Sequence, residues 1–329
     1  MKIVGVNGFG RIGRCFTRIA LNDPQIDVAL VNDLADVNTL AHLLKYDSIH
    51  GPFALAFEIQ GNTLVFENGK KLVFISERNP ELINWASYGV EVVIESTGLF
   101  LTREAASKHL IGGAKHVVIS APANEEDIPS VVLGVNDDQI DWTNTVVSNA
   151  SCTTNNAAPM VKVLKDLLDI DVAYISTVHS YTSDQRLHDA PHKDLRRARA
   201  AANSIIPTST GAAKAITRIF PDLKGKITGG SFRVPVSDGS VTEMTLVTKT
   251  DITAEQINAA MKKAAEGPLK GILQYTEDPI VSVDVIGNTH SVVFDSGLTT
   301  VFNGLIKVAG WYDNEAGYSN RLVEVVKRF

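Results

Sequence analysis

The sequence predicts a two-domain α/β protein in which a Rossmann-type doubly wound parallel sheet is followed by an α+β catalytic domain with a mostly antiparallel sheet. Two observations predict the first domain. Buried-type strands alternate with helical patterns up to Cys152, which is typical of a parallel sheet covered by helices. A glycine-rich turn separates the first strand from the first helix. Beyond Cys152 the alternation gives way to longer neighbouring strands, and these predict the second domain.

Length and composition are those of an ordinary globular chain with room for two cores, because single cores rarely grow beyond about 250–300 residues. The net charge of -6 argues against nucleic acid or an anionic membrane as an obligate partner. The two cysteines lie in different contexts, which indicates a reducing compartment. The glycine-rich turn follows Met1 too closely for a signal peptide, and no apolar run approaches the roughly 20 residues of a membrane span. We therefore expect a cytoplasmic protein.

A dinucleotide fingerprint opens the chain. Residues 2–6 form an expected strand, followed by the G-x-G-x-x-G segment Gly8-Phe9-Gly10-Arg11-Ile12-Gly13 and a helical pattern. The next expected strand, 28–33, ends in Asp33, where a carboxylate would hold the adenosine ribose. The charge of Asp33 would repel a 2′-phosphate and favour NAD over NADP.

The remainder of the first domain continues the pattern. Short strands are expected at 53–57, 63–66 and 71–75, and buried strands at 90–95 and 116–120 on either side of a helix at 103–111. Ligands bind at the carboxyl ends of parallel strands. We therefore expect the polar residues there, Ser96, Thr97, Gly98 and Ser120, to support the dinucleotide.

Cys152 is the predicted nucleophile. It lies where an apolar run gives way to a helix-like segment at 157–168, and a helix N-terminus favours a thiolate. An ordinary thiol, with a pKa of about 8.5, is only a few per cent ionised at neutral pH. The alternative, an inert buried cysteine, is disfavoured because the surrounding segment Ser151-Cys152-Thr153-Thr154-Asn155 would make a poor core.

A histidine and a basic loop follow. The expected strand 172–179 ends in His179, which could fold back onto Cys152 as a Cys–His pair requires; a structural histidine is the alternative. The polar loop 183–203 is rich in arginine, which indicates an anionic substrate or an oligomer contact. Residues 207–211 precede a helix at 212–219 and form a candidate anion site. His188 and His192 are separated by Pro191, which breaks the helix that a metal pair would need, so we expect no metal.

The last third completes the second domain. Residues 229–236 and 240–248 are expected to be antiparallel strands, with Arg233 as a charge that needs a partner. A helix at 254–266 is capped by Thr253, and strands are expected at 281–286, 291–295 and 305–311. A helix at 319–329 ends the chain.

The sequence resembles the phosphorylating, NAD-dependent type I glyceraldehyde-3-phosphate dehydrogenases along its whole length. The resemblance is carried by Asn7-Gly8-Phe9-Gly10-Arg11-Ile12-Gly13-Arg14, Ser151-Cys152-Thr153-Thr154-Asn155, His179, Asp194-Leu195-Arg196-Arg197-Ala198-Arg199 and Trp311-Tyr312-Asp313-Asn314-Glu315. It implies an NAD-binding domain at 1–151, joined by the C-terminal helix 315–329, a catalytic domain at 152–314, and a homotetramer.

The resemblance also implies the reaction and its residues. D-Glyceraldehyde 3-phosphate is oxidised and phosphorylated to 1,3-bisphosphoglycerate, in glycolysis and gluconeogenesis, through a hemithioacetal and a thioester on Cys152, with His179 assisting and inorganic phosphate cleaving the thioester. The implied cofactor residues are Gly8, Phe9, Gly10, Arg11, Ile12, Gly13, Asp33, Leu34, Arg78, Ser96, Thr97, Gly98, Ser120, Asn314 and Tyr318. The implied phosphate sites comprise Thr182, Arg197 and Arg233, and separately Ser151, Thr153, Thr210 and Gly211.

The sequence departs from the family pattern at two positions, and two other functions are possible alternatives to this one. Asn156 stands where many members have a second cysteine, and Ala316 replaces a bulkier residue. The related erythrose-4-phosphate dehydrogenase, which hydrolyses its thioester, is the nearest alternative, and phosphate dependence separates the two. A catalytically silent nucleotide-binding protein is the other, and it is disfavoured because Cys152 and His179 are both present.

Overall fold

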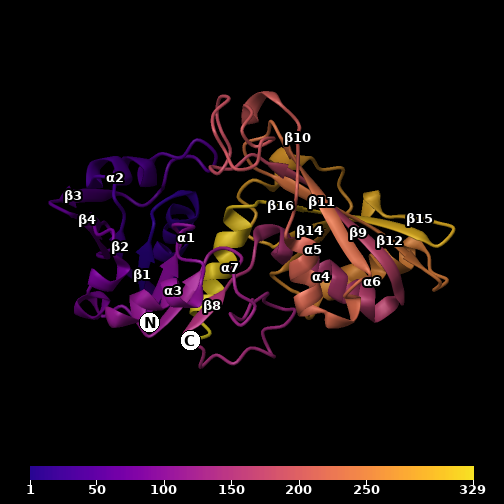
Figure 1. Ribbon diagram of the computed structural model, residues 1–329, viewed down its shortest axis with the longest axis horizontal. Helices are drawn as coiled ribbons and strands as arrows, with labels where there is room; N and C mark the ends of the chain where they lie inside the picture. The colour runs from indigo at the N-terminus through magenta and orange to yellow at the C-terminus, as the bar shows by residue number, and fades with distance from the viewer. The chain divides into compact units, whose positions relative to one another are not determined.

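The computed structural model describes residues 1–329, and the chain divides into two compact units (Figure 1). Unit 1 comprises Met1–Val131, Asp137–Ser151 and Ser319–Phe329. Unit 2 comprises Val132–Asn136 and Cys152–Tyr318.

Unit 1 contains an eight-stranded sheet in the order β3-β4-β5-β2-β1-β6-β7-β8. The six strands from β5 to β8 are parallel, and β3 and β4 add an antiparallel edge. Its strands are β1 Lys2–Asn7, β2 Ile26–Asn32, β3 Phe57–Gln60, β4 Thr63–Phe66, β5 Lys71–Ile75, β6 Val92–Glu95, β7 His116–Ile119 and β8 Val146–Ser148. Its helical segments are α1 Arg11–Leu21, α2 Val37–Lys45, η1 Pro80–Leu82, η2 Trp85–Tyr88 and α3 Arg103–Ile111, and α7 Ala316–Val326 runs into it from unit 2.

The strand order of unit 1 places a topological switch beside β1. The chain passes from β1 to β2 on one side and returns to β6 on the other, and ligands bind where the strand order reverses in this way. The expected parallel sheet is therefore confirmed. The strand expected at 53–57 is wrong: the turn at Gly61 and Asn62 pairs Gln60 with Thr63, so β3 extends back from that turn only to Phe57.

Unit 2 contains a second sheet, in the order β10-β11-β9-β12-β16-β14-β13, with β15 paired to β16. All pairs are antiparallel except β11 with β9 and β13 with β14, which confirms a mostly antiparallel sheet. Its strands are β9 Ile170–Ser180, β10 Ile206–Thr208, β11 Ile227–Val234, β12 Ser240–Thr248, β13 Leu273–Thr276, β14 Val292–Asp295, β15 Thr300–Phe302 and β16 Leu305–Tyr312. Its helical segments are α4 Cys152–Leu167, η3 Ala201–Asn203, α5 Ala212–Ile219, η4 Pro221–Leu223, α6 Ala254–Glu266, η5 Ser282–Val285 and η6 Ser296–Leu298.

Helices α4, α5 and α6 gather on one side of the unit 2 sheet (Figure 1). The alternation along β9 explains this arrangement, because Ala173 and Ile175 are buried while Val172, Tyr174 and Val178 are exposed. Helix α6 has the predicted bounds and begins with a capping box at Thr253.

Strands β11 and β12 are antiparallel, as expected, and β9 lies between them, parallel to β11 and antiparallel to β12. One expectation for unit 2 is wrong. Residues 281–286 form a 3-10 turn rather than a strand, and β13 takes the edge of the sheet. The final helix starts at Ala316, three residues earlier than the sequence pattern indicates and one later than the resemblance implies, because Asp313 accepts the N–H groups of Glu315 and Ala316. No helix has the length and apolar character needed to span a membrane.

Candidate active site

Cys152 is the first residue of α4, and the turn before it is strained. Ala150 has a φ of 52°, in the left-handed region that side chains other than glycine rarely adopt. The Ser148 hydroxyl steadies this turn, since it accepts from the Ala150 N–H at 3.0 Å and donates to the Ala121 carbonyl at 2.7 Å. The predicted helix start at the cysteine is therefore present.

The structure brings Cys152 and His179 together. Sγ lies 3.4 Å from Nε2 of the imidazole. The other ring nitrogen, Nδ1, lies 2.8 Å from the Ser180 carbonyl oxygen, which can only accept a hydrogen bond. Nδ1 therefore carries the proton, and Nε2 is left as an acceptor directed at the thiol. This is the geometry of a general base beside a nucleophile.

Burial keeps both groups of the pair neutral. Burial and the Arg233 guanidinium, whose Nη1 lies 3.1 Å from Nδ1, lower the pKa of His179 to about 3. Loss of water raises the pKa of the Cys152 thiol, although the Arg233 charge and hydrogen bonds with Thr153 act against this rise. The expected net lowering of the thiol pKa at the helix start is therefore wrong, because desolvation outweighs it. The resting pair is therefore a thiol and a neutral imidazole whose Nε2 is directed at the sulfur.

Three predicted anion-binding residues form one cluster in unit 2. Arg233 Nη1 donates to Thr182 Oγ1 at 3.2 Å, and Arg197 Nη1 donates to Asp184 Oδ2 at 2.6 Å. Sequence reasoning missed Asp184, which also accepts from Thr182. Burial alone would raise the pKa of Asp184, but the hydrogen bond from Thr182 and the two guanidinium charges outweigh burial and lower it. The Asp184 carboxylate thus pairs with guanidinium charge that an anionic ligand could bind in its place.

The second predicted anion-binding group is more dispersed. Thr210 accepts from the Ala212 N–H at 3.2 Å at the start of α5, and Gly211 is the N-cap of that helix. Thr153 lies in the first turn of α4, where its hydroxyl is 3.0 Å from that of Tyr312. Ser151 belongs to unit 1. Tyr312 was not among the predicted site residues, and its ring also contacts the His179 ring edge-on at 5.9 Å.

Asn314 is fixed by two serines. Its Oδ1 accepts from Ser180 Oγ and from Ser240 Oγ, each at 2.8 Å. These two bonds set the orientation of the amide, so the nitrogen is the group left to donate elsewhere. Tyr318, the other residue that the resemblance places at the cofactor from this part of the chain, is buried.

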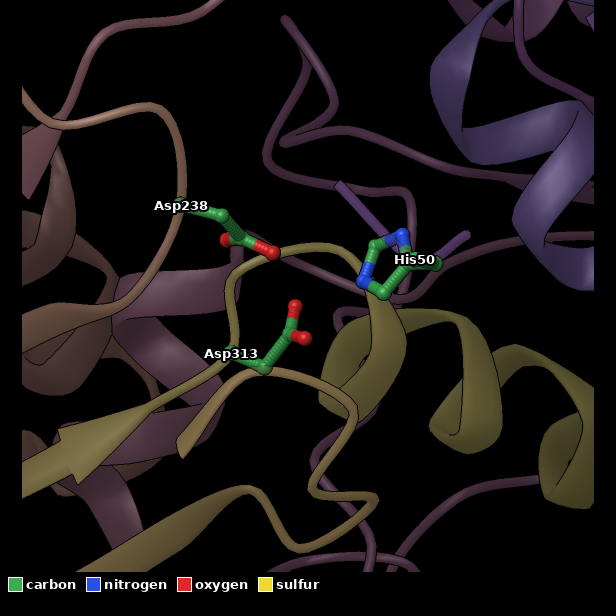
Figure 2. A group of neighbouring side chains, drawn as sticks. All are labelled: His50, Asp238 and Asp313. Atoms are coloured by element: carbon green, nitrogen blue, oxygen red, sulfur yellow. The ribbon is translucent and has the colours of Figure 1, made fainter. Parts of the chain in front are cut away.

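Two buried carboxylates lie next to this segment. Figure 2 shows the Asp313 carboxylate directed toward that of Asp238. Asp313 Oδ2 accepts from the Gly287 N–H at 2.7 Å, and Asp238 accepts from the Gly239 N–H at 2.8 Å. Sequence patterns did not predict this approach of the two acids, because Asp238 follows β11 and Asp313 follows the distant strand β16.

Unit 1 contains a cavity of about 340 Å³ at the switch beside β1, within the size range of ligand sites. Its lining includes the predicted residues Gly8, Gly10, Asp33, Leu34, Arg78, Ser96 and Thr97. The lining residues that sequence reasoning did not identify are Asn7, Asn32, Glu77, Leu99 and Phe100.

The glycine-rich loop is built around backbone contacts. A Cβ on Gly13 would lie 2.2 Å from the Gly8 carbonyl oxygen, so no other residue fits there. Asp33 Oδ2 accepts from the Phe9 N–H at 2.7 Å and holds the loop against the end of β2. These features fit a dinucleotide pyrophosphate, which needs a close backbone approach at a helix N-terminus.

The other predicted cofactor residues lie around this loop. Phe9 packs edge-on against Phe74, and Arg11 pairs with Asp47 at 2.6 Å. Ile12 is in the first turn of α1, Gly98 follows Thr97 with a φ of 74°, and Ser120 follows β7.

Comparison with known proteins finds matches over both parts of the chain. Residues 2–103 match the model of the glyceraldehyde 3-phosphate dehydrogenase NAD binding domain, and residues 151–314 match that of its C-terminal domain. The chain is 55% identical over 98% of its length to glyceraldehyde-3-phosphate dehydrogenase 1 of Bacillus subtilis, covering 96% of that protein. It has the same identity and coverage with glyceraldehyde-3-phosphate dehydrogenase of Geobacillus stearothermophilus. It is 52% identical to glyceraldehyde-3-phosphate dehydrogenase 1 of Bacillus cereus, over 99% of this chain and 97% of that one.

Proposed function

Because the chain belongs to the glyceraldehyde-3-phosphate dehydrogenase family, we propose that Cys152 is its nucleophile and His179 the base that accepts the thiol proton. The chain is an NAD-dependent oxidoreductase of the phosphorylating type, and its substrates are glyceraldehyde 3-phosphate and inorganic phosphate. The observation that carries the residue assignment is the 3.4 Å contact between Sγ and Nε2, with Nδ1 held by the Ser180 carbonyl.

The residues divide the chemistry as follows. As Sγ bonds to the aldehyde carbon, the thiol proton passes to Nε2 of His179, and the resulting hemithioacetal loses its hydride to become a thioester. Bound NAD supplies the hydride acceptor. Inorganic phosphate then attacks the thioester carbonyl, the acyl phosphate leaves, and the sulfur recovers a proton. The Cys152 N–H at the start of α4 and the imidazole are the donors available to the oxyanion.

The surrounding residues take supporting roles. We assign one phosphate site to Thr182, Arg197 and Arg233, because their donors converge in unit 2. The second is assigned to Ser151, Thr153, Thr210 and Gly211. Unit 1 is the NAD-binding domain, in which Asp33 faces the adenosine ribose, and unit 2 is the catalytic domain. Asn314, oriented by two serines, is assigned to the nicotinamide carboxamide.

An assay of NADH formation with glyceraldehyde 3-phosphate, with and without inorganic phosphate, tests this function. Turnover should require phosphate; unchanged turnover without it would indicate a hydrolytic aldehyde dehydrogenase instead. Cys152→Ser should abolish turnover and alkylation by iodoacetamide. Cys15→Ala, which removes the other, buried cysteine, should retain both. Retention of activity in Cys152→Ser would remove the assigned nucleophile.

We also propose that the protein is a cytoplasmic homotetramer. The sheet face of unit 2 opposite its helices exposes a band of apolar side chains, namely Val172, Tyr174, Val178, Phe232, Val247 and Leu305. A second copy of the chain would cover this band. Light scattering should report a tetramer, and Tyr174→Lys should shift it to smaller species. A monomeric wild type would contradict the proposal. Neither cysteine forms a disulfide.

A further inference from the structure

A buried carboxylate lies beneath the cofactor cavity of unit 1. Glu95 ends β6 and is 1% exposed. It accepts four hydrogen bonds, from Asn7 Nδ2 at 2.6 Å, His109 Nε2 at 2.9 Å, Thr97 N at 2.9 Å and Thr97 Oγ1 at 2.5 Å. The motifs of the sequence did not point to this residue.

The proton arrangement of this network is determined by a tryptophan. Trp85 Nε1 lies 3.2 Å from His109 Nδ1, and an indole N–H can only donate. Nδ1 must therefore accept, which leaves the proton on Nε2, where it points at Glu95. Trp85 and His109 are fully buried, so water cannot replace either partner.

Glu95 is linked to the cavity lining on both sides of the switch. Thr97, which it holds by two bonds, accepts from the Leu99 N–H at 3.1 Å. On the other side, Asn7 accepts from Asn32 Nδ2 at 2.7 Å, and Asn32 in turn accepts from the Glu77 N–H at 2.8 Å. All five of these residues line the cavity.

The same turn supports the glycine-rich loop. Ser96 Oγ donates to the Gly8 carbonyl at 2.7 Å. A Cβ on Gly8 would lie 2.8 Å from the Thr97 N, so the loop is packed directly against the segment that Glu95 holds. Displacement of Thr97 would therefore displace the backbone that approaches the pyrophosphate.

We propose that Glu95, held by His109 and Trp85, is a positioning residue for NAD: it shapes the cavity before the cofactor binds and so sets cofactor affinity. It contacts the lining and not the reacting atoms. The role requires a carboxylate specifically. A glutamine would direct its NH2 either at the N–H groups of Asn7 and His109 or at the Thr97 N–H, so in each orientation two donors would oppose each other.

The first test compares Glu95→Gln with Glu95→Asp. Glu95→Gln should raise the Kd for NAD, measured by calorimetry, about 10-fold or more, because buried donors lose their acceptor. The KM for NAD should rise with it, while the KM for glyceraldehyde 3-phosphate and alkylation of Cys152 stay unchanged. Glu95→Asp, which keeps four acceptor positions, should recover part of the affinity.

A control separates positioning from loss of stability. Leu64→Ala removes a fully buried side chain from β4, away from the cavity lining, and should lower the melting temperature without changing the Kd for NAD. If Leu64→Ala weakens NAD binding as much as Glu95→Gln at equal loss of stability, the proposal is overturned.

The second test asks whether NAD binding depends on the hydrogen bond that His109 donates to Glu95. His109→Gln can accept from Trp85 through its carbonyl and donate to Glu95 through its NH2, whereas His109→Leu can do neither. His109→Leu should weaken NAD binding, and His109→Gln should recover most of the loss. Equal affinities in the two variants would refute a role for the donor to Glu95.

Discussion

The charge of Asp33 should decide between NAD and NADP, and Asp33→Asn tests this. Asp33 lines the unit 1 cavity, where Oδ2 accepts from the Phe9 N–H at 2.7 Å and Oδ1 from the Ala35 N–H at 3.0 Å. If the carboxylate faces the ribose, a 2′-phosphate must come close to it. The substitution removes the charge while keeping nearly the same shape.

The size of the effect follows from Coulomb's law. A phosphate monoester carries about -1.5 charges at neutral pH, and replacing a hydroxyl bonded to the carboxylate puts it about 5 Å away. At an effective dielectric constant of about 40, between the surface and bulk-water values, the repulsion is about 2.5 kcal/mol. That energy corresponds to about 60-fold in affinity.

The assay is kcat/KM for NAD and for NADP at saturating glyceraldehyde 3-phosphate and phosphate. The amide loses one backbone hydrogen bond, but this loss affects both cofactors, so their ratio isolates the charge. Asp36→Asn is the matched control, because Asp36 caps α2, is exposed and does not line the cavity. A ratio that changes equally in the two variants, or a wild type that prefers NADP, would refute the reasoning.

Three further predictions concern reactivity and stability. The raised thiol pKa and the neutral imidazole predict that iodoacetamide alkylation of Cys152 in the free enzyme keeps accelerating from pH 7 to about pH 9; a plateau below pH 7 would contradict this. Asn156→Ala should lower the free energy of unfolding in urea by about 2 kcal/mol, because the buried amide donates to the carbonyls of Ser291, Gly310 and Trp311. Asn38→Ala, at an exposed position, should lower the free energy of unfolding much less. The pKa of Asp47 is lowered to about 2, because hydrogen bonds from the His50 and Ile49 N–H groups and from Arg11 outweigh burial. Its stabilisation is therefore fully present above the unfolded pKa of about 3.9 and is lost as pH falls through 2. Asp47→Asn should cost about 1 kcal/mol at pH 7, after solvent screening is allowed for, and nothing once the pH is well below 2.

Local patterns predicted the elements that depend on neighbouring residues. The helix at 254–266 has its predicted bounds because its cap, Thr253, and the apolar face lie within one stretch of chain. The glycine-rich turn after β1 was equally predictable, since tight turns and close backbone approach require glycine at particular spacings.

Contacts between distant residues escaped prediction. Asp184, in the loop after β9, lies near enough to Arg233 of β11 for the guanidinium charge to lower the pKa of its carboxyl, and His109 meets Glu95 through the packing of a helix on a strand. Periodicity reports which face of an element is apolar, but not which element will cover it. The prediction for the Cys152 thiol failed for a related reason. The helix start that favours a thiolate is visible in the sequence, whereas the burial that raises the thiol pKa comes from the whole fold.

The pairing of β9 with β11 makes the charge next to the Cys152–His179 pair depend on the register of these two strands. Arg233 stands beside His179 in this ladder, and a Cβ at Gly229 would lie 2.4 Å from the Ile175 carbonyl oxygen, so the two strands approach closely. Because side chains alternate between the two faces, a single residue inserted upstream within β11 would turn the guanidinium away from the imidazole. In engineered versions the two strands must therefore be transplanted together and without gaps.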